Sequence, residues 1–493
     1  MTGTCFHRAI PPGLPTAVGV FFALLVTPVT ASDVKDLSFA PQTGFVILNF
    51  DTENETAAVA GRDDAGQPRL ALIASGDASI LVTEYALPDD AVAIDAGANG
   101  EERDVLFVLC ATRVLQLDAA DGELREVSSV TSLYRGISYA PLTSELNFAR
   151  DIDDDAMAEL VVQDFDVVTV LDGDAYSERR RLALPTLRRS FERAQNYRPA
   201  RTALIPGAMI SVRGDQLLRY DLTSADTADQ LIAPIVNEMG LGLSSEREIE
   251  RFYNGDPELD QRDVLLREPE LLTDLTGDGL PDLVTLETVS SGVFDKETTY
   301  RLYVAKSPYG FDTSPDTVFS GSGYQFGLRT VALDEERTAL VAPGIRIGLG
   351  AIIGALFSRS VSIDIAIYSS DGDSQFAAKP TAEVSAKVRF DFGSGQVELP
   401  TVAFGDLNGD GQQDLILKRG REQLEWRRNL GEGTFVGRGE TFDILAPKDG
   451  FNVIAADFDG DGRDEILVRY GLQDGNDIKR RVRLLDPGNI DSR

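Results

Sequence analysis

Histidine is almost absent from this 493-residue chain, and His7 is the only one. Without a histidine beyond position 7, the rest of the chain forms no Ser-His-Asp or Cys-His catalytic system and no imidazole-bound zinc site. A Gly-Lys-Ser/Thr phosphate loop and a glycine-rich dinucleotide fingerprint are also missing. The sequence therefore excludes the most familiar hydrolase, zinc-enzyme and nucleotide-binding classes.

Cysteine and positive charge are scarce as well. Cys5 lies in a predicted signal peptide, so the mature chain has Cys110 alone and forms no internal disulfide. Cys110 sits in an apolar strand, where a buried small hydrophobe is expected rather than a nucleophile. Lys and Arg number 47 against 80 Asp and Glu, which gives a net charge of −33. Such a surface repels phosphates and anionic membranes, so no nucleic-acid partner is expected.

The two long apolar stretches are too short to span a bilayer. Arg8, the apolar run Ala17–Val26 and the small residues up to Ala31 predict a cleaved signal peptide over 1–31, with an uncleaved anchor as the alternative. We therefore expect a secreted, periplasmic or cell-surface protein with no transmembrane span in the mature chain. The second stretch, Ile347–Phe357, indicates a core helix or buried insertion, or else an interfacial or partner-contacting segment.

Three segments share one acidic loop that runs directly into an apolar strand. They are Asp274–Asp282, Asp406–Asp414 and Asp457–Glu465. Oxygen-bearing side chains stand at loop positions 1, 3, 5 and 9, and glycine stands at position 6. Ca²⁺ takes six to eight oxygen ligands, so this loop suits it. Position 12 is Thr285, Leu417 or Val468, and apolar β-branched residues follow each loop. The unit is thus strand, calcium loop, strand, and not an EF-hand.

A fourth copy, Asp151–Glu159, has Ala156 in place of the glycine, and a fifth trace at Asp95 has Gly97 at position 3 and is assigned no metal. We predict calcium ligands from the side chains at positions 1, 3, 5 and 9 and from the backbone carbonyl at position 7. In the three full loops these residues are Asp274, Thr276, Asp278, Leu280, Asp282, Asp406, Asn408, Asp410, Gln412, Asp414, Asp457, Asp459, Asp461, Arg463 and Glu465. In the fourth copy they are Asp151, Asp153, Asp155 and Glu159.

The loops begin at residues 95, 151, 274, 406 and 457, and the two long intervals are about twice the short ones. Each long interval therefore predicts one more unit without its loop, at Ala203–Tyr220 and at Arg329–Ala342. A period of about 40 to 60 residues with four strands indicates a β-propeller. We predict an all-β propeller of seven or eight blades over 32–493. The expected insertions are at about 188–201, 223–270 and 343–385, and helical spacing is seen over 226–253.

The units resemble the FG-GAP (VCBS-type) repeats of integrin α-chain propellers and of many bacterial secreted proteins. Phe404-Gly405-Asp406 precedes one loop, and Asn429–Phe435 resembles the closing glycine turn and Phe of that repeat. The resemblance implies calcium in the three full loops and a non-catalytic scaffold that binds a protein or a glycan. Two alternatives stay open: a polysaccharide lyase-type enzyme with its site on the rim insertions, and a structural subunit of a cell-envelope assembly.

Two further motifs are better explained by structure than by function. Arg213-Gly-Asp215 spells an integrin-binding tripeptide, but it lies between two apolar strands where Gly-Asp is a good hairpin turn. Trp426 follows the loop at Asp406 and is expected in the core, with ligand stacking as the alternative. Asn54-Glu-Thr56 fits a glycosylation acceptor by pattern only.

Overall fold

The computed structural model describes residues 33–487 apart from gaps, the longer of which are 133–141, 184–201, 223–234 and 346–358. The predicted signal peptide, the insertion at 188–201 and the apolar segment Ile347–Phe357 lie outside the described residues, so the expectations for them stay predictions. None of the helices in the described part of the chain has the length or apolar composition that a bilayer-spanning helix needs.

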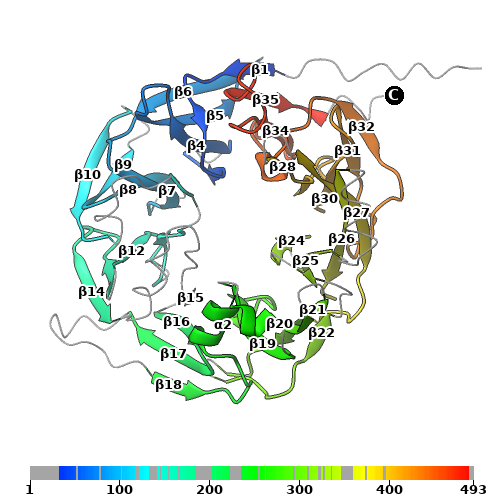
Figure 1. The fold of residues 1–493 in the computed structure, drawn as a ribbon. Coiled ribbons are helices and arrows are strands. Elements are labelled where there is room, and N and C mark those ends of the chain that lie inside the picture. The colour runs from blue at the N-terminus through cyan, green and yellow to red at the C-terminus, as the bar shows by residue number, and fades with distance from the viewer. Residues whose placement is uncertain are drawn as a thin grey trace, which may run out of the picture.

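Eight antiparallel sheets follow one another around a ring, so the chain is an all-β propeller with eight blades (Figure 1). This is the larger of the two blade numbers that the sequence predicts. In most sheets consecutive strands pair with each other, and they follow one another from the centre of the ring to its rim, as β7 to β10 show in Figure 1.

The blades are numbered here in chain order. Blade 1 contains β2 (Ala40–Pro41), β3 (Val46–Leu48), β4 (Thr56–Arg62), β5 (Pro68–Ser75) and β6 (Ile80–Ala86). Blade 2 contains β7 (Ala91–Ala98), β8 (Asp104–Cys110), β9 (Arg113–Leu117) and β10 (Leu124–Ser129). Blade 3 contains β11 (Ala149–Arg150), β12 (Glu159–Gln163), β13 (Val167–Leu171) and β14 (Glu178–Ala183), and blade 4 contains β15 (Thr202–Ile205), β16 (Ala208–Arg213), β17 (Gln216–Asp221) and β18 (Ile235–Glu238).

Blades 5 to 8 complete the ring. Blade 5 contains β19 (Val264–Thr273), β20 (Asp282–Gly292), β21 (Asp295–Tyr303) and β22 (Thr317–Phe319), and it follows the helices α2 (Glu246–Tyr253) and α3 (Pro257–Asp260). Blade 6 contains β23 (Tyr324–Gln325), β24 (Arg329–Ala332), β25 (Thr338–Ile345), β26 (Ser360–Ser369), β27 (Ala382–Asp391) and β28 (Gln396–Glu398). Blade 7 contains β29 (Val402–Gly405), β30 (Asp414–Lys418), β31 (Gln423–Arg427) and β32 (Glu440–Asp443). After the 3₁₀ helix η2 (Gly450–Asn452), blade 8 contains β33 (Val453–Ala456), β34 (Glu465–Arg469), β35 (Arg481–Leu485) and β1 (Asp33–Asp36).

Blade 8 closes the ring because it combines the first described strand with the last three. β1 pairs antiparallel with β35, with Asp33 opposite Leu484 and Asp36 opposite Arg481. The Asp33 carboxylate also accepts a hydrogen bond of 2.7 Å from the backbone N–H of Ile80 in blade 1. β35 is therefore paired on both sides, and the seam between the first and last blades carries no free β35 edge.

The core lies between neighbouring blades. One buried cluster joins blades 7 and 8 through residues such as Ile416, Trp426 and Ile466. Because a neighbour covers each face of a blade, the second strand of a blade is buried on both faces. β34 shows this, since all of Glu465–Arg469 is buried. Trp426 is 3% exposed, which confirms its predicted place in the core.

Several predictions made on short segments are confirmed. The two units without loops exist as blade 4 and as the first strands of blade 6. Gly214 and Asp215 form the turn between β16 and β17, where Arg213 pairs with Gln216. Cys110 is fully buried in β8, and burial raises the pKa of its thiol to about 12, so it stays a protonated, inert side chain.

Other predictions need correction. The helical spacing expected over 226–253 is only partly right. Residues 226–234 lie outside the described part of the chain, Ile235–Glu238 is the strand β18, and Glu246–Tyr253 is the helix α2. Antiparallel pairing of β18 with β17 in the same sheet overrides the local helical pattern there. The ranges 223–270 and 343–385 also contain blade strands: β18 and part of β19 in the first, and part of β25, β26 and part of β27 in the second.

Blade 5 carries a half-buried ion cluster that stabilises its long strands. Glu287 on β20 accepts hydrogen bonds from the side chains of Arg301 at 2.8 Å and Arg267 at 3.1 Å. Desolvation raises the pKa of Glu287, but the two guanidinium groups outweigh it, so the pKa lies below its usual value.

Candidate metal centre

All four acidic loops connect the first strand of a blade with its second strand. We call the end of the ring that carries them the loop face. Position 9 is in each case the first residue of the second strand, and the side chains there are almost completely buried. These residues are Glu159, Asp282, Asp414 and Glu465. The buried end of each loop is thus fixed by the blade. The apolar residue at position 2 is also buried, whereas positions 1 and 3 to 7 of the three full loops are exposed or partly buried.

The carboxylate at position 1 organises each full loop. In the loop at Asp457 it accepts hydrogen bonds from the backbone N–H groups of Gly460 at 2.7 Å and Gly462 at 2.9 Å. The loops at Asp274 and Asp406 repeat this pattern with their own amides. Position 6 requires a left-handed backbone, with φ of 78° to 85° at the three glycines and 66° at Ala156. Ala156 therefore holds the turn at a conformational cost that glycine avoids.

Gly405, the glycine ahead of the loop at Asp406, marks a close approach of two blades. A Cβ at this position would lie 2.3 Å from the Cβ of Ala455 on β33. Phe404 packs against Phe435 with ring centroids 6.3 Å apart, which connects the motif to the closing turn of the same repeat. These contacts explain why the sequence Phe-Gly precedes this loop.

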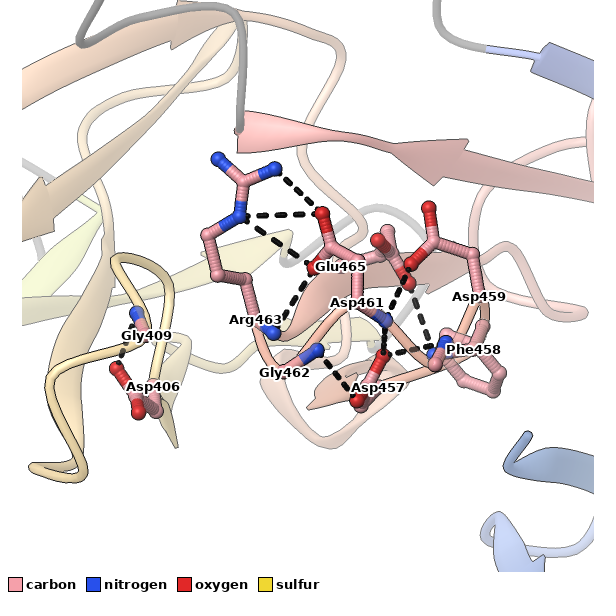
Figure 2. A network of polar contacts seen from close by, with 10 residues as sticks. Asp406, Gly409, Asp457, Phe458, Asp459, Asp461, Gly462, Arg463 and Glu465 are labelled. Carbon is pink, nitrogen blue, oxygen red and sulfur yellow. Dashed lines mark hydrogen bonds and ion pairs between the residues drawn. The ribbon is translucent and has the colours of Figure 1, made fainter. Parts of the chain in front are cut away.

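The loop at Asp457 brings three carboxylates close together. One oxygen from each of Asp457, Asp459 and Glu465 lies within 4.8 Å of the others, and the same region is drawn in Figure 2. Desolvation raises the pKa of Glu465 to about 8, and repulsion from Asp459, Asp457 and Asp486 adds to the shift. Asp486 directly follows β35, so the fold brings it to this loop from outside the repeat. Sequence reasoning missed it because no spacing rule links it to the loop.

Position 5 of this loop lies apart from that group. The Asp461 carboxylate pairs with the guanidinium of Arg463, its neighbour at position 7 (Figure 2). This side-chain hydrogen bond holds the pKa of Asp461 below its usual value. The arrangement balances the charge of the outer carboxylate, and the Arg463 guanidinium also interacts electrostatically with Asp459 and Asp486.

The loops at Asp274 and Asp406 have a different interior. Both oxygens of Asp282 accept backbone hydrogen bonds, from Leu275 and Ala305, each at 2.9 Å. Asp414 is held in the same way by the Trp426 indole N–H and the Asn429 backbone N–H, each at 2.7 Å. Burial raises the pKa of each carboxyl to about 6. Position 9 in these loops thus anchors the turn as well as offering oxygen.

The remaining predicted ligands of these two loops lie on the exposed turn. Asp278 and Asp410 at position 5 accept from the backbone of Leu280 and Gln412 at position 7, at 2.9 and 3.0 Å. Asn408 at position 3 points its amide at Asp410. In the described part of the chain, the carboxylates of these loops do not gather within 4.8 Å as those of the loop at Asp457 do. Thr276 and Asn408 supply neutral oxygens where the other loops have Asp.

The loop at Asp151 gathers Asp151, Asp153 and Glu159 within the same 4.8 Å limit, but it also receives a cation from the protein itself. Arg179 of β14 donates to the Asp153 carboxylate and, at 3.2 Å, to Glu159 Oε1. Its side chain is only 17% exposed. Asp155, the predicted ligand at position 5, accepts from the backbone N–H of Met157 at 2.8 Å. The charge of this loop is therefore partly neutralised by a residue that the sequence analysis did not consider.

A repeated clamp ties the loop ends of neighbouring blades together. In blade 8, Asp464 accepts from the backbone N–H of Asp406 in blade 7 at 2.7 Å, and its own N–H donates to the Asp406 carbonyl at 2.8 Å. Glu55 makes the same pair of bonds with Asp457 across the closing seam. Asp104 makes it with Asn49 between blades 1 and 2. In each case the acid stands at or directly before the start of the second strand, which is the only sequence signal for the clamp.

Comparison with known proteins agrees with this geometry. Residues 406–468, which contain the loops at Asp406 and Asp457, match the family described as FG-GAP-like repeat. No curated protein matches the chain.

Solved structures with a similar fold share little sequence. Sqt1 from Chaetomium thermophilum is 11% identical, with 93% of this chain and 98% of that chain covered and a TM-score of 0.47. Hsv2 from Kluyveromyces lactis is 9% identical, with 83% and 100% covered and a TM-score of 0.41. The WD40 domain of Toxoplasma gondii coronin is 11% identical, with 92% and 82% covered and a TM-score of 0.34. At these sequence identities and TM-scores, the similarities say nothing about the function of this chain.

Proposed function

Because the chain is an eight-bladed β-propeller that carries FG-GAP-like repeats, we propose that it is a calcium-stabilised, non-catalytic scaffold outside the cytoplasm that binds a protein or glycan partner. The ions are assigned to the loops at Asp274, Asp406 and Asp457. Their donors are oxygen atoms only, which a hard cation such as Ca²⁺ prefers to softer metals. When bound, the ion neutralises the loop carboxylates and fixes the turn.

One observation carries the calcium proposal. The loop at Asp457 holds three carboxylates within 4.8 Å of one another, and Asp486 adds further negative charge nearby. Like charges at this distance repel, and they do so more strongly where burial removes water. A divalent cation removes that repulsion, and the turn already presents the oxygens on one side. The fourth loop is different, and we assign no ion to it because Arg179 supplies the positive charge there.

The proposed location follows from the predicted signal peptide. β1 begins at Asp33, just after the expected cleavage position at Ala31, so cleavage there would leave every described strand in place. Calcium would give the ring a rigidity that secreted domains often take from disulfides, which the single mature cysteine excludes. Extracellular calcium sites bind in the range of about 10⁻⁴ to 10⁻³ M, which matches calcium levels outside cells better than those inside.

The binding role rests on the exposed side chains of the face opposite the loop face. Phe451 and Leu472, each 59% exposed, lie in connections of blades 7 and 8 at that end of the ring. Exposed aromatic and apolar side chains favour a contact surface. A lyase-type activity or an assembly role is the alternative.

Two experiments test the proposal on the chain from residue 32 onward. A calorimetric calcium titration should give three sites, and thermal melting should show a lower melting temperature after chelation. A pull-down and a glycan array in calcium should then identify the partner. A folded protein with no bound calcium and no change on chelation would refute the metal assignment.

A further inference from the structure

Four arginines line a groove on the face opposite the loop face, where blades 6, 7 and 8 meet. The groove has a volume of about 820 Å³. Its arginines are Arg389 of β27, Arg419 and Arg421 of the β30–β31 turn, and Arg483 of β35. β30 runs from its acidic loop at one end of the blade to this turn at the other, so the groove is separated from the metal loops by the length of a strand.

A tight turn places two of the arginines side by side. The backbone N–H of Arg419 donates to the Gln423 carbonyl at 2.9 Å, and Gly420 adopts φ of 81°. Because residues with a side chain rarely adopt this backbone conformation, glycine is needed between the two arginines. Arg419 and Arg421 are both exposed at the mouth of the groove.

Most of this positive charge lacks a partner. Among the residues that the structure describes, Arg389, Arg421 and Arg483 form no ion pair, and the buried Nε of Arg483 has no hydrogen-bond acceptor. Arg419 lies 3.7 Å from Glu425, but that acid also pairs with Arg427 at 3.1 Å. The chain has 80 acids for 47 basic residues, so partners are plentiful elsewhere. Guanidinium groups gathered without partners repel one another, and an anion removes that repulsion.

The other polar side chains of the groove indicate which kind of anion fits. Guanidinium groups bind carboxylates through two parallel hydrogen bonds. Glu422 and Asp443 also line the groove, and Gln423 Nε2 donates to Asp443 Oδ1 at 2.7 Å. These two carboxylates would repel a dense polyanion such as an acidic peptide, but they accept hydrogen bonds from hydroxyl groups.

We propose that this groove binds a short acidic saccharide, with sugar carboxylates on the arginines and sugar hydroxyls on Glu422 and Asp443. The proposal rests on the scaffold function proposed above and names its ligand class and site. The volume lies within the range of small-ligand pockets, which is about 300 to 1,000 Å³. The net charge of −33 disfavours long polyanions at a distance. A small hydroxylated ligand with a few separated carboxylates fits both the volume of the groove and the negative charge of the chain.

The experiment measures binding of a galacturonic acid trimer to the calcium-loaded chain by calorimetry, with the methyl-esterified trimer, a glutamate hexapeptide and inorganic phosphate as comparison ligands. The acidic trimer should bind, and the Arg421→Gln and Arg483→Gln variants should each weaken it about tenfold or more, as expected for loss of a charge-assisted pair. The trimer affinity of the Arg421→Lys variant should lie between those of the native chain and Arg421→Gln, because lysine keeps the positive charge but loses the two parallel hydrogen bonds of a guanidinium.

The matched control is Arg438→Gln, which removes an exposed arginine from the β31–β32 connection on the loop face. It should leave trimer affinity unchanged. Equal binding of the esterified trimer, binding of the peptide or phosphate without the trimer, or unchanged affinity in both groove variants would overturn the proposal. Calcium stoichiometry and melting temperature are measured on the same samples, so a protein that binds calcium but no trimer refutes the groove alone.

Discussion

Replacing Arg179 with glutamine should create a calcium site that the native chain lacks. The substitution removes the guanidinium that donates to Asp153 and Glu159 and leaves three carboxylates whose oxygens lie within 4.8 Å of one another. Asp153 Oδ1 is already buried without a hydrogen-bond donor in the described part of the chain. The variant loop then has the same kind of carboxylate set as the loop at Asp457.

The expected loss of stability follows from the burial of the ion pair between Arg179 and Glu159. Glu159 is completely buried and the Arg179 side chain is 17% exposed, and breaking a buried pair costs about 3 kcal/mol or more. For a ring over residues 33–487, roughly 2 cal/mol/K per residue gives an unfolding entropy of about 1 kcal/mol/K. Without calcium, the melting temperature should therefore fall by about 3 °C. Calcium at about ten times its Kd should restore roughly 1.4 kcal/mol of the loss.

The assay is a calorimetric calcium titration of native chain and variant, followed by melting of both with calcium and with chelator. The variant should bind one more ion than the native chain, and calcium should raise its melting temperature by a larger amount. Arg181→Gln is the control, since Arg181 lies two residues along β14 in an exposed pair with Glu178. A folded Arg179→Gln protein with unchanged stoichiometry would show that the arginine does not stand in for a cation.

Four further predictions follow from other contacts. Chelation should lower the melting temperature of the native chain by about 4 °C, because three sites at about ten times Kd contribute roughly 4 kcal/mol; an unchanged curve contradicts structural calcium. Asp457→Ala and Asp410→Ala should each lose one ion in a calcium titration, and constant stoichiometry would mean the loops are wrongly assigned. Glu287→Gln should destabilise the chain at pH 7. Since the Glu287 pKa is lowered, its pairing stabilises the fold above the unfolded value of about 4.3 and is lost as pH falls through the folded value, so urea unfolding of variant and native chain should converge in acid. Gly405→Val should cost about 1 to 3 kcal/mol in urea unfolding by forcing β29 away from Ala455, whereas Gly437→Val, where a Cβ meets nothing within 4 Å, should cost little.

The propeller could be predicted because its signal is local and repeated. Each acidic loop and the strand after it occupy about 15 consecutive residues, and the family implies a ring. The five loop starts and the two long intervals account for seven units, so the blade number stayed between seven and eight because blade 1 carries no such loop. Blades 4 and 6 have also lost the loop that marks a unit. Their strands at Ala208–Arg213 and Thr338–Ile345 were still visible as apolar runs. The strand β18 was misread because four residues carry too little period to separate strand from helix.

The chemistry around the loops was harder to predict because its partners come from elsewhere in the chain. Arg179 lies 26 residues beyond Asp153, and Asp486 lies 21 residues beyond Glu465. Glu55 reaches Asp457 only because the ring closes. No periodicity links such pairs. The groove arginines likewise come from three blades, and only the assembled ring brings them together.

The placement of β1 in the last blade has a consequence for the order of events during synthesis. A chain that emerges amino end first presents Asp33–Asp36 long before β35, its partner, exists. The strand must wait while more than 400 residues follow it, and an unsatisfied strand edge invites pairing with foreign chains. Three of its four residues are charged, and charged residues on a strand edge disfavour such pairing until the last blade forms.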